Sequence, residues 1–162
     1  MEKLEALYRR HAPAVLRFAW GLCGDRARAE DLVSETFVRL LTKAPSIETR
    51  TALAYLLAIA RNAFLDEARS RRREVPLPDD LLAPGPDPDD LIDDVGRLRA
   101  VMETLRALPE GERAALLLRV DHELPYDEIA GVLGISISAA KLRVHRARRR
   151  LVAARDAGGM ER

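Results

Sequence analysis

Apolar side chains near the end of the chain recur with helical period in two adjacent stretches. The first set falls at i, i+3, i+4 and i+7 and comprises Tyr126, Ile129, Ala130 and Leu133. Gly134 follows, where a helix commonly ends in a left-handed residue, and Ser136 is placed to cap a second helix. The second helix repeats the period at Ala140, Val144, Ala147 and Leu151. The pattern predicts a helix-turn-helix.

The remaining faces of the second helix are polar and basic. One face carries Ser138, Lys141, Leu142 and His145, and a flank carries Arg143, Arg146 and Arg150. A helix that reads DNA needs a mixed face for base edges and cations for phosphates. A basic run alone favours a solvated helix at the end of a bundle. The preceding helix and the Gly-Ile-Ser turn favour DNA binding instead.

The first 73 residues predict three or four further helices. Residues 2–22 have helical spacing, with Pro13 as a kink or break. Asp25 is placed to cap residues 26–42, whose apolar stripe ends at Leu40 and Leu41. Residues 51–73 form a long helix with a strongly basic end. The face of the 26–42 helix opposite its apolar stripe carries Asp31, Ser34, Glu35 and Val38.

The net charge of +1 conceals a strong segregation of charge along the chain. Residues 1–73 hold 14 basic and 9 acidic side chains, residues 74–96 hold 8 acidic and no basic ones, and residues 97–162 hold 13 and 9. Five of the nine prolines also lie in 74–96, and proline disfavours helix. We expect an acidic extended linker there, with a rigid surface loop as the alternative. The predicted domains are 1–73 and 97–155, followed by a frayed tail, 156–162.

The composition favours an all-α fold of two small helical domains. Apolar residues make up 48% of the chain and aromatic residues only 4%, and runs of β-branched residues are scarce. No apolar run approaches the roughly 18 residues that cross a bilayer, and the N-terminus lacks a signal-peptide layout. The single cysteine, Cys23, excludes an internal disulfide and suggests a reducing compartment. We therefore expect a cytoplasmic protein with no membrane insertion.

Catalytic and metal-binding signatures do not stand out in the sequence. His11, His122 and His145 are far apart, and Cys23 has no second cysteine with which to form a zinc site. The sequence contains neither a phosphate-binding loop nor a nucleophile elbow. We expect no metal, no cofactor and no enzymatic activity of the chain itself.

Four motifs, in order along the chain, resemble the bacterial sigma-70 superfamily. Residues 29–40, Ala-Glu-Asp-Leu-Val-Ser-Glu-Thr-Phe-Val-Arg-Leu, resemble conserved region 2.2. Residues 54–69 resemble regions 2.3 and 2.4, residues 108–119 resemble region 4.1, and residues 126–151 resemble region 4.2. Two such blocks without a third domain between them are similar to the extracytoplasmic-function (ECF, group 4) sigma factors.

The resemblance implies a sigma factor that binds core RNA polymerase and directs promoter-specific initiation. It assigns contact with the clamp helices of the polymerase β′ subunit to Asp31, Ser34, Glu35 and Val38. It assigns recognition and melting of the −10 element to Asn62, Arg61, Arg69, Arg71, Arg72 and Arg73, with the loop 46–50 walling a base pocket. It assigns recognition of the −35 element to Ser138, Lys141, Leu142, His145, Arg146 and Arg149.

Leu142 departs from the pattern that the resemblance supplies. The family more often has serine at this position, and a leucine side chain could contact a thymine methyl group. We therefore expect Leu142 to change which bases are preferred at −35.

The implied partners are core RNA polymerase, through its β′ clamp helices and β flap, promoter DNA and an anti-sigma factor. Two other classes of protein remain as alternatives. One is a stand-alone helix-turn-helix regulator whose residues 1–73 bind a ligand or dimerise, which would favour a palindromic DNA site. The other is an interaction protein that titrates an anti-sigma factor, and the intact arginine runs argue against it.

Overall fold

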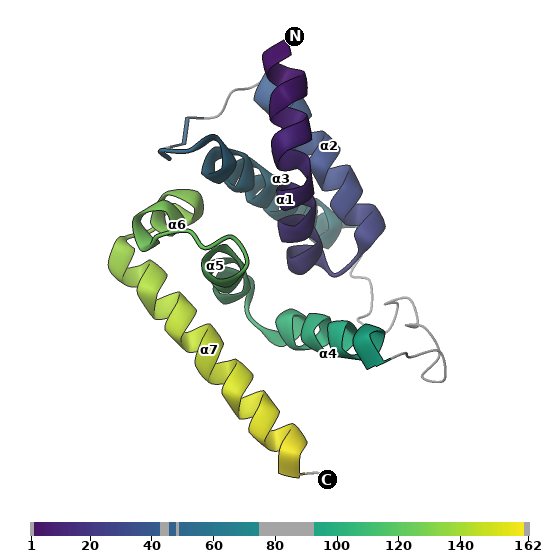
Figure 1. Cartoon of the computed structure of the whole chain (residues 1–162), viewed down its shortest axis with the longest axis vertical. Coiled ribbons are helices and arrows are strands. Elements are labelled where there is room, and N and C mark those ends of the chain that lie inside the picture. The colour runs from purple at the N-terminus through teal and green to yellow at the C-terminus, as the bar shows by residue number, and fades with distance from the viewer. Residues whose placement is uncertain (1, 43–45, 48, 75–92, 161–162) are drawn as a thin grey trace.

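The chain folds into seven helices within the residues described by this computed structural model, which are 2–42, 46–47, 49–74 and 93–160 (Figure 1). The N-terminal unit comprises α1 (Glu2–Cys23), α2 (Arg26–Thr42) and α3 (Ala52–Glu74). The C-terminal unit comprises α4 (Asp93–Ala107), α5 (Glu110–Val120), α6 (Tyr126–Leu133) and α7 (Ile137–Met160). The described part of the chain holds no strand, so the predicted all-α class is confirmed.

The N-terminal unit follows the predicted helices with two differences. Helix α1 continues through Pro13, so of the predicted kink or break the break is wrong. Both halves of α1 pack on the core, through Leu7 before the proline and Phe18 after it, and this packing offsets the lost backbone hydrogen bond. The predicted inward stripe of α2 also ends early, because Leu41 is 64% exposed. The predicted cap is present, since the Asp25 carboxylate accepts a hydrogen bond from the backbone of Arg28 at 3.2 Å.

The helix-turn-helix forms as its sequence predicts. Helix α6 ends at Gly134, whose φ of 66° and ψ of 39° are left-handed. A side chain there would strain the turn, which is why glycine suits the position. The Ser136 hydroxyl then accepts a hydrogen bond from the backbone N–H of Ala139 at 3.1 Å and caps α7. The inward stripe of α7 is buried at Ala140, Val144 and Ala147.

Two predicted boundaries differ from the observed helices. Helix α4 begins at Asp93, inside the predicted 74–96 linker, and the linker residues 75–92 lie outside the described part of the chain. Helix α7 continues to Met160, so residues 156–160 are helical rather than a frayed tail. An established helix gains one hydrogen bond for each residue added, which lets α7 extend past its last packed turn.

The two units share one hydrophobic core, which the sequence did not predict. Buried residues of α1, α2 and α3 form a single cluster with buried residues of α5, α6 and α7. Helices α5 and α6 lie against α1 and α3 (Figure 1). Gly21 of α1 makes this approach possible, because a Cβ there would come within 2.7 Å of the Leu117 side chain of α5. None of the described helices is long and apolar enough to cross a membrane.

Candidate functional site

The outer face of α7 presents the predicted −35 residues to solvent. Six exposed side chains share this helix, namely Ser138, Lys141, Leu142, His145, Arg146 and Arg149. Leu142 is 46% exposed, which leaves a large apolar side chain among polar neighbours. Behind this face the small residues of the buried stripe let α7 pack closely on α5 and α6. The Lys141 ammonium also lies 5.8 Å from the centroid of the Tyr126 ring. The arrangement exposes hydroxyl, ammonium, imidazole and methyl groups of the kinds that meet base edges.

The arginine flank of α7 is only partly available for phosphates. The Arg150 Nε donates to the Glu112 carboxylate of α5 at 2.7 Å. The Arg143 guanidinium lies against Gly111 of the same helix. Arg150 therefore ties α7 to α5 through its Nε, while its side chain stays 56% exposed, and Arg143 lies beside α5. The helical period showed that these arginines share a side of α7, but could not show that α5 contacts that side.

The face of α2 predicted to meet the polymerase clamp is exposed at Asp31, Ser34, Glu35 and Val38. The Glu35 carboxylate accepts a hydrogen bond from Arg39 at 2.9 Å. Arg39 also donates to Asp66 of α3 at 2.9 Å, so this pair is anchored to the neighbouring helix. Asp31, one turn before Glu35, is exposed beside this network. The face thus combines carboxylates with an exposed valine.

Asn62 and the 46–50 loop meet at one cavity of about 550 Å³. Ser46 and Ile47 of the loop line one side of the cavity, and Asn62 lines it from α3. The opposite wall belongs to α6 and its turn, with Gly131 and Gly134 among its residues. The cavity therefore lies between the predicted −10 surface and the helix-turn-helix unit.

The arginines predicted to follow the −10 strand have different surroundings. Arg61 donates two hydrogen bonds, at 2.8 and 2.9 Å, to the two oxygens of the Glu110 carboxylate in α5. Its side chain is only 11% exposed. Arg71 pairs with Glu67 at 2.9 Å and Arg69 lies 3.9 Å from Asp66. Both side chains are exposed, as is that of Arg72. Arg73 belongs to α3, and its side chain lies outside the described part.

Arg50 is a residue whose contact the sequence reasoning missed. Its backbone N–H and its Nε donate to Glu128 of α6 at 2.9 and 3.0 Å, and its Nη2 lies 2.6 Å from Asp127. The hydrogen bond to Glu128 raises the pKa of Arg50, as does the charge of Asp127. Adjacent carboxylates in the first turn of α6 are ordinary helix starts, so they gave no signal of a distant partner.

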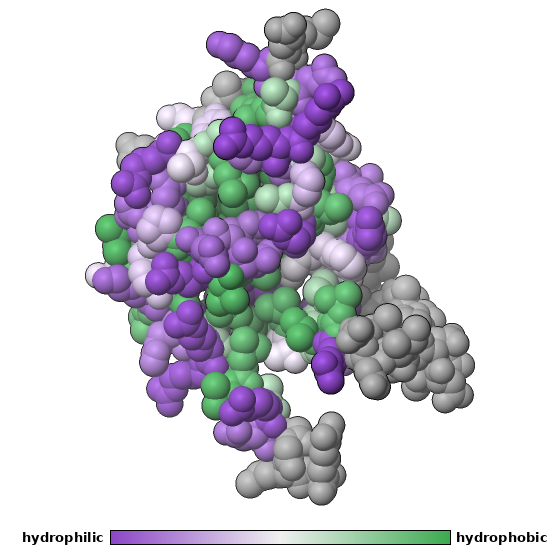
Figure 2. Space-filling view, in the orientation of Figure 1, coloured by the Kyte–Doolittle hydropathy of each residue, from purple (hydrophilic) through white to green (hydrophobic). Residues whose placement is uncertain are grey.

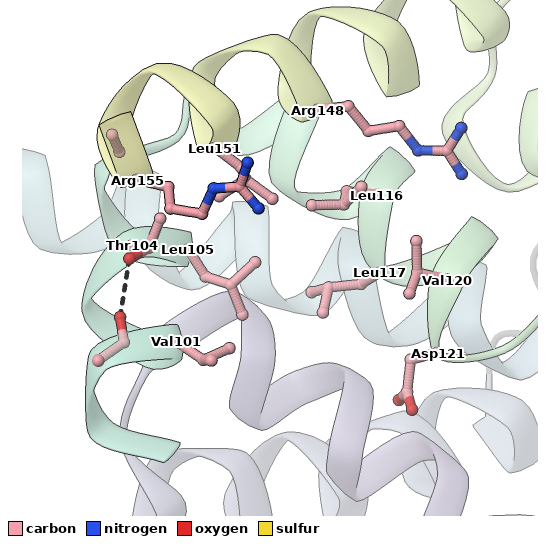
Figure 3. Close-up of a pocket in the computed structure, with 12 residues that line it drawn as sticks. Val101, Thr104, Leu105, Leu116, Leu117, Val120, Asp121, Arg148, Leu151 and Arg155 are labelled. Atoms are coloured by element: carbon pink, nitrogen blue, oxygen red, sulfur yellow. Dashed lines mark hydrogen bonds between the residues drawn. The ribbon is translucent and has the colours of Figure 1, made fainter. Parts of the chain in front are cut away.

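An apolar groove of about 560 Å³ runs between α4, α5 and α7 (Figure 3). Its apolar lining includes Val101, Leu105, Leu116, Leu117, Val120 and Leu151. Arg148 and Arg155 reach it from α7, and Asp121 lies at the end of α5. Hydrophobic residues are visible at the surface between α4 and α7 (Figure 2). This groove is a second surface that the sequence analysis did not identify.

The buried titratable groups serve packing. Burial raises the pKa of the Cys23 thiol, whose sulfur donates to the backbone carbonyl of Asp25 at 3.1 Å. Burial lowers the pKa of His122, whose ring packs edge-on against Phe18 with centroids 5.8 Å apart. Among the residues that the structure describes, no three of the His, Cys, Asp and Glu side chains gather as a metal site would require.

Comparison with protein families matches both units. Residues 7–74 match the model described as Sigma-70 region 2, and residues 98–151 match the model described as Sigma-70, region 4. Together these matches cover most of the chain and separate at the same place as the two helical units.

Relatives that are similar in sequence over most of this chain are named ECF RNA polymerase sigma factors. The chain is 36% identical over 157 residues to ECF RNA polymerase sigma factor SigE of Mycolicibacterium smegmatis, covering 93% of this chain and 61% of that protein. It is 31% identical to ECF RNA polymerase sigma factor SigM of Bacillus subtilis, covering 96% of each chain. It therefore spans less than two thirds of one relative and nearly all of the other.

Solved structures show the same arrangement of helices. The sigma factor RpoE in complex with the anti-sigma factor NepR, from Bartonella quintana, has a TM-score of 0.75 and 30% identity, covering 93% of this chain and 95% of that chain. CnrH in complex with the cytosolic domain of CnrY has a TM-score of 0.69 and 26% identity, covering 95% of this chain and 88% of that chain.

Proposed function

We propose, from the fact that this chain belongs to the ECF sigma factors of the sigma-70 family, a division of labour between its two units. The chain directs promoter-specific initiation by RNA polymerase. We assign the −35 element to the C-terminal unit and the −10 element to the N-terminal unit. The polymerase supplies the chemistry, and we expect the chain itself to work in the cytoplasm without catalysis.

The exposed face of α7 carries this proposal. Lys141 and His145 lie one turn apart on the solvent side of the helix, and Leu142 lies beside Lys141. A major groove admits one helix and offers donors, acceptors and thymine methyl groups to such a face. Arg146 and Arg149 lie farther along the same helix and suit the flanking phosphates.

The N-terminal unit suits an unpaired strand rather than a duplex groove. Asn62 faces a cavity, and its amide could hydrogen-bond the edge of an extruded base. Arg69 and Arg72 are exposed farther along α3, where they could follow the backbone of the displaced strand. This assignment gives the two units unlike DNA targets.

Two further surfaces suit core polymerase. The α2 face with Asp31, Ser34, Glu35 and Val38 is proposed to meet the β′ clamp helices. The groove between α4, α5 and α7 is proposed to receive the β flap, because its floor is apolar and accessible.

An anti-sigma factor is also a proposed partner. RpoE of Bartonella quintana is described in complex with the anti-sigma factor NepR, and CnrH in complex with the cytosolic domain of CnrY. The likeness of this chain to both proteins supports a regulator of the same kind that covers one or more of these surfaces.

Run-off transcription with core polymerase tests the division of labour. We expect initiation only when the chain is added, and a loss of product when either promoter element is scrambled separately. Binding to a palindromic site without polymerase, together with no transcript, would contradict the proposal. A template with both elements scrambled is the control.

The groove has its own test. Val101→Asp places a charge on an exposed apolar lining residue and should weaken binding to core polymerase. Ala153→Asp adds the same charge at an exposed position of α7 that does not line the groove. Equal loss of polymerase binding in both variants would show an effect of net charge rather than of the groove.

A further inference from the structure

Arg39 lies between α2 and α3, beside the α2 face that is proposed to meet the polymerase clamp. Its Nε donates to the Glu35 carboxylate one turn earlier, and its Nη1 donates to Asp66 of α3, both at 2.9 Å. The Arg39 side chain is only 18% exposed, whereas the side chains of Glu35 and Asp66 are 47% and 51% exposed. One mostly buried guanidinium therefore holds two carboxylates that face solvent.

An ordinary surface pair on the same helix shows how this contact differs. The Arg26 Nε lies 3.4 Å from Glu30, and both side chains are more than half exposed. Exposed pairs of this kind contribute little, because water screens them and both side chains remain mobile. Burial lowers the pKa of Arg39, but the hydrogen bonds and charges of its two carboxylate partners more than reverse that effect, so the net shift of the pKa is upward. Arg39 is thus held in place in a way that Arg26 is not.

The bonds to Arg39 leave Glu35 able to accept a second donor. Arg39 contacts Oε1 of Glu35 and Oδ2 of Asp66. Within the described residues, Glu35 has no cationic partner other than Arg39. Both carboxylates line one hollow of about 410 Å³ between α2 and α3, which leaves room for the side chain of a partner. A cation that approaches this face therefore meets a carboxylate whose position is already fixed.

Arg39 has two opposite effects on such a cation. Glu35 and Asp66 carry two negative charges, and Arg39 cancels one of them, which weakens the attraction of a cationic partner. The hydrogen bonds of Arg39 also hold the Glu35 side chain in one orientation, so less conformational freedom is lost when a partner binds. The loss of freedom for one long side chain corresponds to about 2- to 10-fold in affinity. Attraction between exposed charges is screened by salt, so we expect the fixed orientation to prevail.

We propose that Arg39 is a positioning residue for the clamp contact. It holds the Glu35 carboxylate, braced against Asp66 of α3, in the orientation that a cationic side chain of the β′ clamp helices meets. Arg39 acts through Glu35 and does not itself touch the partner. Asp66 supports the docking face although it belongs to the neighbouring helix. The inference rests on the proposed contact between the α2 face and the clamp.

The test measures the affinity of the full chain for core RNA polymerase, without DNA, in Arg39→Met and Arg39→Lys. Methionine removes the charge and both hydrogen bonds, whereas lysine keeps the charge but lacks the planar fork that reaches two carboxylates. If Arg39 acted only through its charge, Arg39→Met would bind polymerase more tightly and Arg39→Lys would bind as the parent chain does. Positioning predicts that both variants bind about 2- to 10-fold more weakly. Unchanged or tighter binding in Arg39→Met would overturn the proposal.

Glu35→Gln shows whether Arg39 acts through Glu35. This substitution should weaken polymerase binding by itself if the clamp contact is as proposed. In the Glu35→Gln background, Arg39→Met should then change the affinity by less than about twofold, because the carboxylate that Arg39 positions is gone. Full additivity of the two substitutions would overturn the positioning role. An unchanged affinity in Glu35→Gln alone would instead count against the proposed clamp contact.

Asp66→Asn tests the brace from α3. Asparagine keeps an oxygen acceptor but replaces a charge-assisted hydrogen bond with a weaker one. We therefore expect a smaller loss of polymerase binding than in Arg39→Met, and none in the Glu35→Gln background. A loss of the same size with and without the Glu35 carboxylate would show that Asp66 acts by another route. The absence of DNA from the assay keeps the contact between Asp66 and Arg69, at 3.9 Å, from affecting the result through the −10 surface.

Arg26→Met is the matched control, because it removes the same charge from an ion pair of the same helix. Its affinity for core polymerase should stay within about twofold of the parent chain. Thermal unfolding of each variant ensures that binding is compared between folded chains. Proton exchange measured by NMR provides a readout that does not involve polymerase. The Nε–H of Arg39 should exchange with water more slowly than that of Arg26, and equal rates would show that Arg39 is not held in solution.

Discussion

The outer face of α7 and the surface of α3 both carry cations suited to DNA, but their surroundings differ. On α7, Lys141 and Arg146 face solvent. On α3, Arg61 is held by Glu110 of the opposite unit, and Asn62 lines a cavity of which α6 forms another wall. An arginine is therefore exposed to solvent on α7, whereas an arginine on α3 is already paired with a carboxylate. The residue type shows which ligands a side chain can bind, whereas the neighbouring residues decide whether the side chain is available to bind them.

The largest effect expected from the comparison concerns the core shared by both regions. Leu118 of α5 is fully buried in the cluster that joins the two units. Leu118→Ala should lower the free energy of unfolding by about 2–5 kcal/mol, because it removes packed methyl groups and leaves a cavity. Calorimetry should show a single unfolding transition, for both units together, at a lower temperature than in the parent chain.

Two separate transitions, with the one from the N-terminal unit unmoved, would show that the units unfold independently. Val152→Ala provides the comparison, because Val152 is half exposed on α7 and its truncation should change stability by less than about 0.5 kcal/mol.

The next effect concerns the open surface of α7. Lys141→Ala or His145→Ala should weaken binding to the −35 element by roughly 1–3 kcal/mol if each side chain contacts a base. The loss should appear in the free chain as well as with polymerase, because this face is exposed. Titrations against the cognate and a scrambled −35 duplex measure it. An equal loss on both duplexes would indicate phosphate contacts only.

The interface between the regions should also respond to pH. Burial lowers the pKa of His122 below its usual 6.5, so the unfolded chain binds more protons than the folded chain below that pH. Stability is therefore complete above about pH 6.5 and is lost as the pH falls toward the folded pKa. Asp121, 3.4 Å from Nε2, favours the protonated ring, and Arg17 opposes it.

Urea unfolding between pH 5 and 7.5 measures this dependence. His122→Gln should flatten the curve, because the buried group no longer titrates. His11 has a pKa lowered in the same direction by partial burial, so His11→Gln separates the two contributions. If the free energy of unfolding of His122→Gln falls with pH as steeply as that of the parent chain, the imidazole does not control the loss of stability.

The smallest effect should be one of preference rather than affinity. Leu142→Ser replaces the exposed leucine of α7 with the residue that the family more often has. We expect the preferred −35 bases to change, with binding to random DNA altered by only a few tenths of a kcal/mol. Selection from a randomised −35 library measures the preference. Identical selected sequences would show that Leu142 makes no base contact.

Most of the local structure was predictable because it depends on neighbouring residues. Apolar spacing located α2, α3, α6 and α7, and the short-range caps at Asp25 and Ser136 formed as expected. The α7 stripe fixed its outer face, so the exposure of Lys141 followed from the period alone. Prediction was weaker at Pro13, where packing of both halves of α1 overcame a local preference against helix.

The sequence by itself therefore determined the helices, their turns and which side of α7 faces outward, because hydrogen bonds and side-chain periods act over a few residues. Only the tertiary structure decided which charges are available. Arg61 and Glu110 are 49 residues apart, and Arg50 and Glu128 are 78 apart. Such pairs form only when the shared core brings the units together, and no local pattern in the sequence indicates which distant residues will pair.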